Sequence, residues 1–177
     1  MRCFIAIDLP EEIKDYLYEL QKQLMDSQNK INWVFKKNLH LTLKFFGEVN
    51  ESDIKKIEDT LARTKFKPFK TKLSGMGVFP TESYIKVVWV GLNPDKEVLA
   101  LQRLIDEEFL ESFPAEQSFV AHLTLGRVKF VKDKEKYVER LKKVKIKELE
   151  FEVNNFKLFK SVLSKEGPKY SVLKVIS

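Results

Sequence analysis

The chain has 177 residues, of which 44% are hydrophobic and 12% aromatic, enough to build a sizeable core. No apolar run approaches the length of a membrane span, and a single cysteine, Cys3, excludes a disulfide within the chain, so we expect a cytoplasmic protein without membrane attachment. The formal net charge of +6 favours an anionic partner.

The first part of the chain predicts a strand and a helix, then two extended stretches and a second helix. Residues 3–9 read as a buried strand, and Pro10 suits the first turn of a helix with an apolar stripe at helical spacing. Residues 31–35 and 39–48 are predicted to be extended. A second helix is predicted over residues 51–64, behind an acidic first turn.

The second part of the chain repeats this order, starting in the second strand of an added hairpin. Residues 69–79 and 84–92 alternate like an antiparallel pair, and a helix begins at Asn93-Pro94 and ends near Phe113-Pro114. The remaining predictions are a strand over 118–129, a helix over 133–144 and a closing hairpin formed by 148–160 and 169–176.

One tetrapeptide occurs twice and contains both histidines of the chain. His40-Leu41-Thr42-Leu43 recurs unchanged as His122-Leu123-Thr124-Leu125. Side chains two apart on a strand share a face, so each histidine points the same way as the threonine that follows it, and the leucines point the opposite way. We therefore expect the leucines to enter a core and the imidazoles and hydroxyls to line a groove.

The order of strand, helix, histidine strand and helix starts once at Phe4–Leu9 and again at Val87–Leu92. This duplication predicts an α+β fold in which two pseudo-symmetric lobes of antiparallel sheet, with outer helices, surround a central groove. Each lobe would contribute one histidine strand to the groove. We expect residues 1–177 to form a single bilobal domain.

Paired imidazoles suit acid–base chemistry on a phosphate ester, because one can accept a proton while the other donates one. Thr42 and Thr124 carry hydroxyls that suit phosphoryl oxygens. We expect no metal and no cofactor, since the histidines lack local ligand spacing and no carboxylate cluster completes a ligand set. A serine-nucleophile elbow and a glycine-rich phosphate loop are also absent from the sequence.

Residues that follow each tetrad are harder to assign. The guanidinium of Arg127 would hold a phosphate, but a regular strand places it on the face of the leucines, so this role requires a bulge or twist at Gly126. Lys44 has the parity of His40, and we expect it to be a solvated lysine beyond the groove. Three nearby aromatic residues fit either base stacking or the core: Trp33, Phe35 and Phe46.

The paired tetrads, the second of which runs into Gly126-Arg127, resemble the motifs of the two-histidine (2H) phosphoesterase superfamily. The opening residues Arg2–Pro10 and the closing residues Ser161–Tyr170 resemble the ends of its RNA 2′,3′-cyclic phosphodiesterase branch, historically called 2′-5′ RNA ligase. The resemblance therefore extends over essentially the whole chain.

This resemblance implies a bilobal fold with a central groove and a metal-independent hydrolysis of the 2′,3′-cyclic phosphate at an RNA end to a 2′-phosphate. By position, His40 would protonate the departing 3′ oxygen and His122 would activate water. Thr42 and Thr124 would hold the phosphate oxygens, with help from Arg127. The symmetry of the sequence does not itself decide which histidine is the acid.

Three other functions remain open. The same site would suit 2′-5′ ligation of tRNA half-molecules or hydrolysis of another cyclic nucleotide. A non-catalytic protein that binds RNA ends through lysines and aromatic residues is the alternative from another class. In each case we expect a monomer whose partner is RNA with a 2′,3′-cyclic phosphate end or a related nucleotide.

Overall fold

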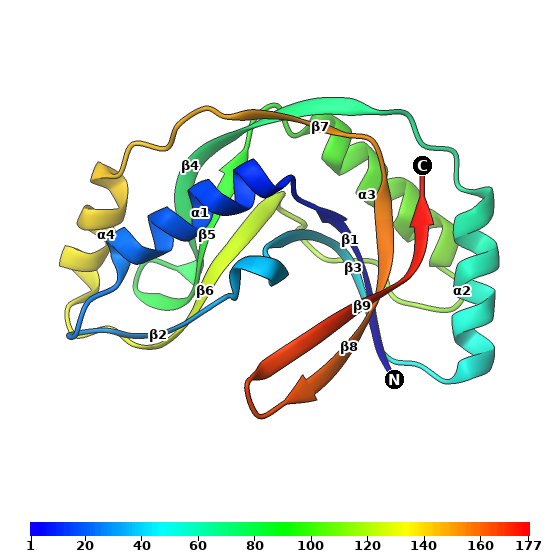
Figure 1. Ribbon diagram of the computed structural model, residues 1–177, viewed down its shortest axis with the longest axis horizontal. Helices are drawn as coiled ribbons and strands as arrows, with labels where there is room; N and C mark the ends of the chain where they lie inside the picture. Colours follow the sequence, from blue (N-terminus) through cyan, green and yellow to red (C-terminus); the bar gives the residue numbers. More distant parts are fainter.

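A computed structural model describes all 177 residues and shows two lobes side by side, each built on one antiparallel sheet (Figure 1). The two-sheet α+β fold predicted from the duplication is confirmed. The four-stranded sheet has the order β3 (His40–Glu48), β1 (Arg2–Asp8), β8 (Phe156–Ser164) and β9 (Gly167–Ile176). The five-stranded sheet has the order β2 (Lys30–Trp33), β6 (His122–Phe130), β5 (Tyr84–Leu92), β4 (Phe69–Thr81) and β7 (Glu150–Val153).

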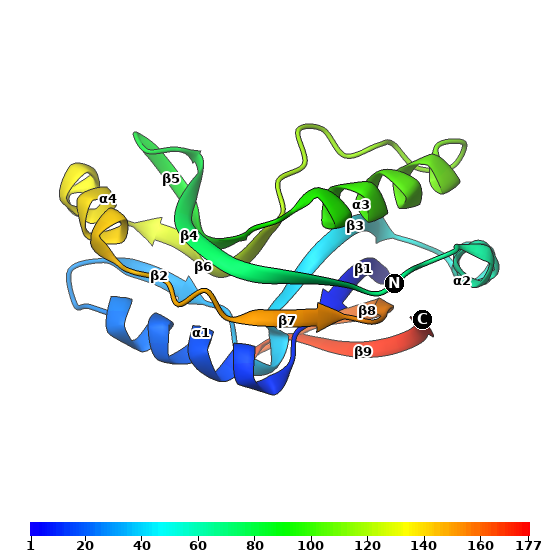
Figure 2. The ribbon, with the colours of Figure 1, turned by 90° about the horizontal axis from the view of Figure 1, so that it is seen from above.

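Four α-helices lie outside the sheets (Figures 1 and 2). Helices α1 (Glu11–Leu24) and α4 (Lys134–Lys143) belong to the lobe of the five-stranded sheet. Helices α2 (Glu51–Arg63) and α3 (Lys96–Phe109) belong to the other lobe, and a short 3-10 helix, η1 (Lys36–Asn38), precedes β3. None of the helices combines the length and the apolar character needed to cross a membrane.

The first helix of each repeat packs on the sheet of the other repeat. Helix α1 follows β1, yet its Gln21 Nε2 donates hydrogen bonds to the carbonyls of Val34 (2.8 Å) and Leu125 (2.9 Å) beside the five-stranded sheet. Helix α3 follows β5, yet Phe109 on this helix packs edge-on against Phe46 of β3. The lobes are therefore interleaved, and they are not the two successive halves of the chain that the duplicated order suggested.

The helix boundaries follow from capping side chains and apolar stripes. Asn50 accepts a hydrogen bond from the backbone of Asp53 at the start of α2, and Asp133 accepts one from Lys136 at the start of α4. Both helices begin within a residue of their predicted start. The predicted apolar face of α1 is buried and consists of Ile13, Leu17, Leu20 and Leu24.

The C-terminal part differs from the predicted closing hairpin. The stretch 148–160 is two strands: β7 pairs with β4 in the five-stranded sheet, and β8 pairs with β1 and β9 in the other. The break falls at Asn154-Asn155, where two polar residues carry the chain between the lobes. The hairpin is therefore formed by β8 and β9, which meet at the turn before Gly167.

One hydrophobic cluster joins the two lobes behind the histidine strands. The leucines of both tetrads are fully buried in it, as the strand alternation predicted: Leu41, Leu43, Leu123 and Leu125. Cys3 also lies in this cluster as a free thiol. The leucine faces of β3 and β6 thus pack into shared core, which fixes the opposite faces of the two strands relative to each other.

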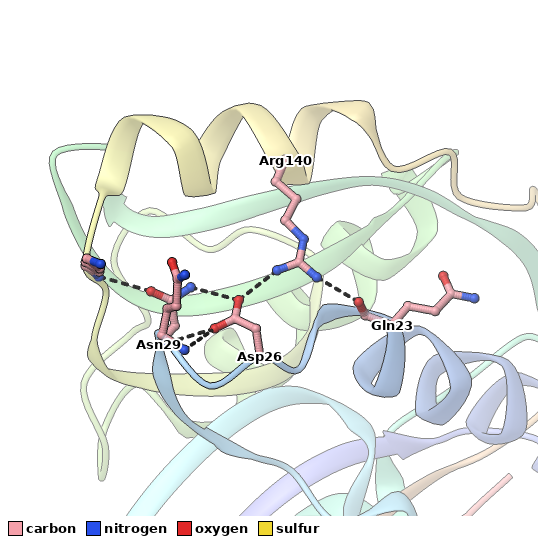
Figure 3. Close-up of polar contacts among 6 residues, drawn as sticks. Gln23, Asp26, Asn29 and Arg140 are labelled. Atoms are coloured by element: carbon pink, nitrogen blue, oxygen red, sulfur yellow. Dashed lines mark hydrogen bonds and ion pairs between the residues drawn. The ribbon is translucent and has the colours of Figure 1, made fainter.

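Polar contacts fix the connection between α1 and β2 (Figure 3). Arg140 on α4 donates one hydrogen bond to the carboxylate of Asp26 (2.8 Å) and another to the carbonyl of Gln23 (2.8 Å). Asp26 also accepts from the backbone of Asn29 (2.8 Å), and the Asn29 side chain accepts from the backbone of Lys132 (3.0 Å). This network holds the start of β2 beside the end of β6.

Candidate active site

All five site residues predicted from the sequence line one hollow of about 440 Å³. His40 and Thr42 reach it from β3, whereas His122, Thr124 and Arg127 reach it from β6. The two strands belong to different sheets, so the hollow lies where the lobes meet. Its wall is completed by β2, the residues around η1 and the start of β9.

Each histidine strand contains a β-bulge at the last leucine of its tetrad. On β3, Thr42 pairs with Ala6 but Lys44 pairs with the adjacent Ile5, so Leu43 is the extra residue. On β6, the pairing passes in the same way from Thr124 to Gly126 and leaves Leu125 extra. A bulge exchanges the faces of the residues that follow it.

The bulge on β6 places Arg127 on the same face as His122 and Thr124. The bulge on β6 is therefore the irregularity that a phosphate-binding role for Arg127 requires. Gly126 contributes by its small size, because a Cβ atom there would lie 2.6 Å from Cγ2 of Ile31 on the neighbouring strand β2. The glycine thus lets β2 pack closely against the bulged strand.

The bulge on β3 overturns the expectation for Lys44. Its side chain is 0% exposed, and its ammonium group donates hydrogen bonds to Asp106 Oδ1 (2.6 Å) and to the carbonyl of Pro114 (2.8 Å). Phe45, not Lys44, faces the hollow, and it occupies the position that Arg127 occupies on β6. The sequence signal for Phe45 was its spacing, since it follows Thr42 by as many residues as Arg127 follows Thr124.

The structure distinguishes the three aromatic residues that fit either base stacking or the core. Trp33 and Phe35 line the hollow, and Phe35 is 50% exposed. Phe46 is buried between Phe109 and Phe113, with ring centroids 5.0 and 4.7 Å away. Phe46 is therefore a core residue, and the other two belong to the surface of the site.

Backbone carbonyls fix the tautomer of both imidazoles. The Nδ1 atom of His40 lies 2.6 Å from the carbonyl of Asn38, and that of His122 lies 2.7 Å from the carbonyl of Val120. A carbonyl oxygen only accepts, so each Nδ1 carries a hydrogen and each neutral ring keeps its Nε2 lone pair for proton transfer. His40 Nε2 is 2.8 Å from Thr42 Oγ1, whose hydroxyl donates to it.

Aromatic rings hold the imidazoles in place. Tyr170 packs edge-on against His40 with ring centroids 5.5 Å apart, and Phe4 lies 5.1 Å from the same ring. Phe79 makes the corresponding edge contact with His122 at 4.9 Å. Tyr170 also lines the hollow, and burial raises the pKa of its hydroxyl, which keeps the hydroxyl a neutral hydrogen-bond donor.

Burial lowers the pKa of both histidines below the ordinary value of 6.5, because the charged ring loses solvation. The hydrogen bonds to the backbone carbonyls oppose this shift, and the positive charge of Arg127 adds to it. At neutral pH both rings of the ligand-free protein are therefore mainly neutral. An anionic ligand in the hollow would favour the charged forms.

Comparison with known proteins gives consistent results. The family model described as "LigT like Phosphoesterase" matches residues 7–89 and again residues 90–170. The chain is 40% identical to an RNA 2′,3′-cyclic phosphodiesterase of Methanocaldococcus jannaschii over 98% of its length and 99% of that protein. It is 38% identical to a protein of the same name from Thermotoga maritima, over 98% of this chain and 93% of that one.

Solved structures show the same fold. The crystal structure of E. coli LigT complexed with 3′-AMP matches with a TM-score of 0.79 and 26% identity, over 98% of this chain and 95% of that one. A crystal structure of a Thermus thermophilus protein matches with a TM-score of 0.77 and 30% identity, over 100% of this chain and 97% of that one. These similarities include the complete two-lobed arrangement.

Proposed function

The chain belongs to the family of LigT-like phosphoesterases, and from this premise we propose that it hydrolyses the 2′,3′-cyclic phosphate at an RNA end to a 2′-phosphate. The observation that carries the proposal is the convergence of both imidazoles on one hollow, with Nδ1 of each ring held by a backbone carbonyl. The names of the relatives support the substrate, and the site residues support a two-histidine mechanism that needs no metal.

The residues of the hollow divide the reaction between them. Arg127 and the hydroxyls of Thr42 and Thr124 hold the phosphate oxygens and stabilise the charge that builds up on them. Neutral His122 takes a proton from water, whose oxygen attacks phosphorus. The bond to the 3′ oxygen breaks, and protonated His40 gives its proton to that oxygen. A 2′-phosphate and a free 3′ hydroxyl result, and exchange with solvent restores both rings.

The surroundings of the two rings support His40 as the acid. Asp8 lies opposite His40 in the sheet, whereas Gly91 lies opposite His122. The Asp8 carboxylate favours the charged form of His40, although burial and the positive charges of Lys14 and Arg127 oppose it. Burial and the charge of Arg127 lower the pKa of His122, which suits a base that starts neutral.

The lowered pKa values predict the pH dependence of hydrolysis. One ring must be neutral and the other protonated, so kcat/KM follows a bell-shaped curve centred between the two free-enzyme pKa values. Because both values lie below 6.5, we expect the maximum of kcat/KM below pH 6.5. The bound phosphate raises both pKa values, so the maximum of kcat should lie at higher pH. Rates measured across pH 4.5–9 test this, and a kcat/KM maximum above pH 7 would contradict it.

Removal of the Arg127 guanidinium should weaken phosphate binding. A charge-assisted hydrogen bond contributes about 1.5–3 kcal/mol, so we expect Arg127→Ala to lower kcat/KM by about 10- to 100-fold. Arg63→Ala, at an exposed position on α2, is the matched control and should change kcat/KM less than about twofold. Equal activity of the two variants in steady-state assays would remove Arg127 from the site.

Product identification tests the proposed function. An oligoribonucleotide with a 2′,3′-cyclic phosphate is incubated with the protein in excess chelator, and the end group is identified by NMR or mass spectrometry. Release of a 2′-phosphate is the expected result. A metal requirement or a 3′-phosphate product would contradict the mechanism. Unchanged substrate that binds tightly would favour the non-catalytic RNA-end binder, and an RNA product longer than the substrate would favour ligation.

A further inference from the structure

A second, larger cavity adjoins the hollow that contains the histidines. Its volume is about 790 Å³, and it lies between α1, η1 and the turn that joins β8 to β9. The two cavities share part of their lining, namely Phe35, Glu166, Gly167 and Pro168. A molecule bound beside the histidines can therefore continue past Phe35 into the second cavity.

The aromatic ring of Phe35 lies at the boundary between the two cavities. Phe35 is 50% exposed, and its ring rests on Gly167, where a Cβ atom would lie only 2.7 Å from Cε2 of the ring. Gly167 also has a φ of +118°, which favours glycine at this position of the turn. Tyr18 on α1 supplies a second exposed ring in the lining of the larger cavity.

The lining also carries more positive than negative charge. Three lysines line the larger cavity (Lys36, Lys37 and Lys169), against the carboxylates of Glu11 and Glu166. Lys36 pairs with Asp15 and Lys169 lies 4.0 Å from Glu166, both at the surface, where such pairs contribute little. Lys37 takes part in no ion pair of the protein. Exposed rings next to lysines match the requirements of a single-stranded nucleic acid.

We propose that this cavity, the upstream groove, binds the single-stranded RNA nucleotides that precede the cyclic phosphate. This inference rests on the proposed function. A 2′,3′-cyclic phosphate is the last group of its strand, so the preceding nucleotides must leave the histidine hollow, and the upstream groove continues from it. Bases stack on Phe35 and Tyr18, and backbone phosphates lie near the three lysines.

The test compares substrates of different length. Wild-type protein should hydrolyse a tetranucleotide with a 2′,3′-cyclic phosphate at least about tenfold more efficiently, in kcat/KM, than 2′,3′-cyclic AMP. The double variant Tyr18→Ala/Lys36→Glu changes two surface residues that line only the upstream groove. It should lose about tenfold on the tetranucleotide, keep its activity on 2′,3′-cyclic AMP within about twofold, and show a smaller salt dependence.

A second double variant serves as the control, and different results would overturn the upstream groove and the proposed function. The double variant Lys55→Glu/Lys67→Glu changes two exposed lysines on and after α2 that line neither cavity, and should leave both activities within about twofold of wild type. No length preference in the wild type, or equal losses on both substrates, would overturn the upstream groove and leave the proposed function standing. Absence of hydrolysis of either substrate by the wild type would instead refute the proposed function.

Discussion

Replacement of His122 by alanine is expected to lower the turnover of a 2′,3′-cyclic phosphate substrate at least about 100-fold in a protein that stays folded. The imidazole is half-buried at the wall of the hollow, so its removal takes away the base without opening the core. The same loss is expected for His40→Ala, because the departing oxygen then lacks its proton donor. Single-turnover assays with circular dichroism measure rate and folding together.

The role of the base can be separated from a structural role by chemical rescue. Added imidazole should restore part of the activity of His122→Ala, with a pH dependence that follows the pKa of the added imidazole. Lys86→Ala, at an exposed position of β5, is a surface control that should retain wild-type turnover. A folded His122→Ala variant that hydrolyses the substrate as fast as wild type would refute the assignment.

Loss of the Asp106 carboxylate is expected to destabilise the fold by about 3–5 kcal/mol, because it leaves the ammonium of Lys44 buried without its partner. Asp106 also accepts hydrogen bonds from Gln102 Nε2 (2.6 Å) and the backbone of Glu116 (3.0 Å). The network thus anchors the segment between α3 and β6, which leads to His122. Urea denaturation of Asp106→Leu measures the effect.

The double variant Lys44→Met/Asp106→Leu is the control for this pair. With both charges replaced by apolar groups, most of the lost stability should return. Hydrogen bonds from Lys44, Gln102 and Glu116 lower the pKa of Asp106 against the opposing effect of burial, so its contribution is full above the ordinary pKa of 3.8 and is lost as pH falls through the lowered value. A double variant no more stable than Asp106→Leu would contradict this account.

The predictable part of the site depended on strand alternation and repetition. The recurrence of His40–Leu43 as His122–Leu125 predicted the two strands, the buried leucines and the shared hollow. Arg127 could be included only on condition of a bulge, which the structure contains. The activity followed from the family resemblance, and the names of the relatives agree with it.

The remaining features depend on tertiary packing that the sequence pattern does not contain. No residue in the sequence marks the bulge at Leu43, yet the bulge buries Lys44 and turns Phe45 to the hollow. Helices α1 and α3 each pack on the sheet of the other repeat. Each helix has an apolar stripe, and a stripe alone does not specify which of the two sheets the helix covers. Asn154-Asn155 is a polar pair of the kind that bounds strands, so the break between β7 and β8 had a signal in the sequence.

The central claim is that both imidazoles contact one phosphate, and a crystal structure with a bound nucleoside 2′-monophosphate tests it most directly. We predict that the phosphate lies between His40 and His122, with Nε2 of both rings and the hydroxyls of Thr42 and Thr124 within hydrogen-bond distance of its oxygens. A phosphate that binds outside the hollow, or that contacts only one of the two rings, would contradict it.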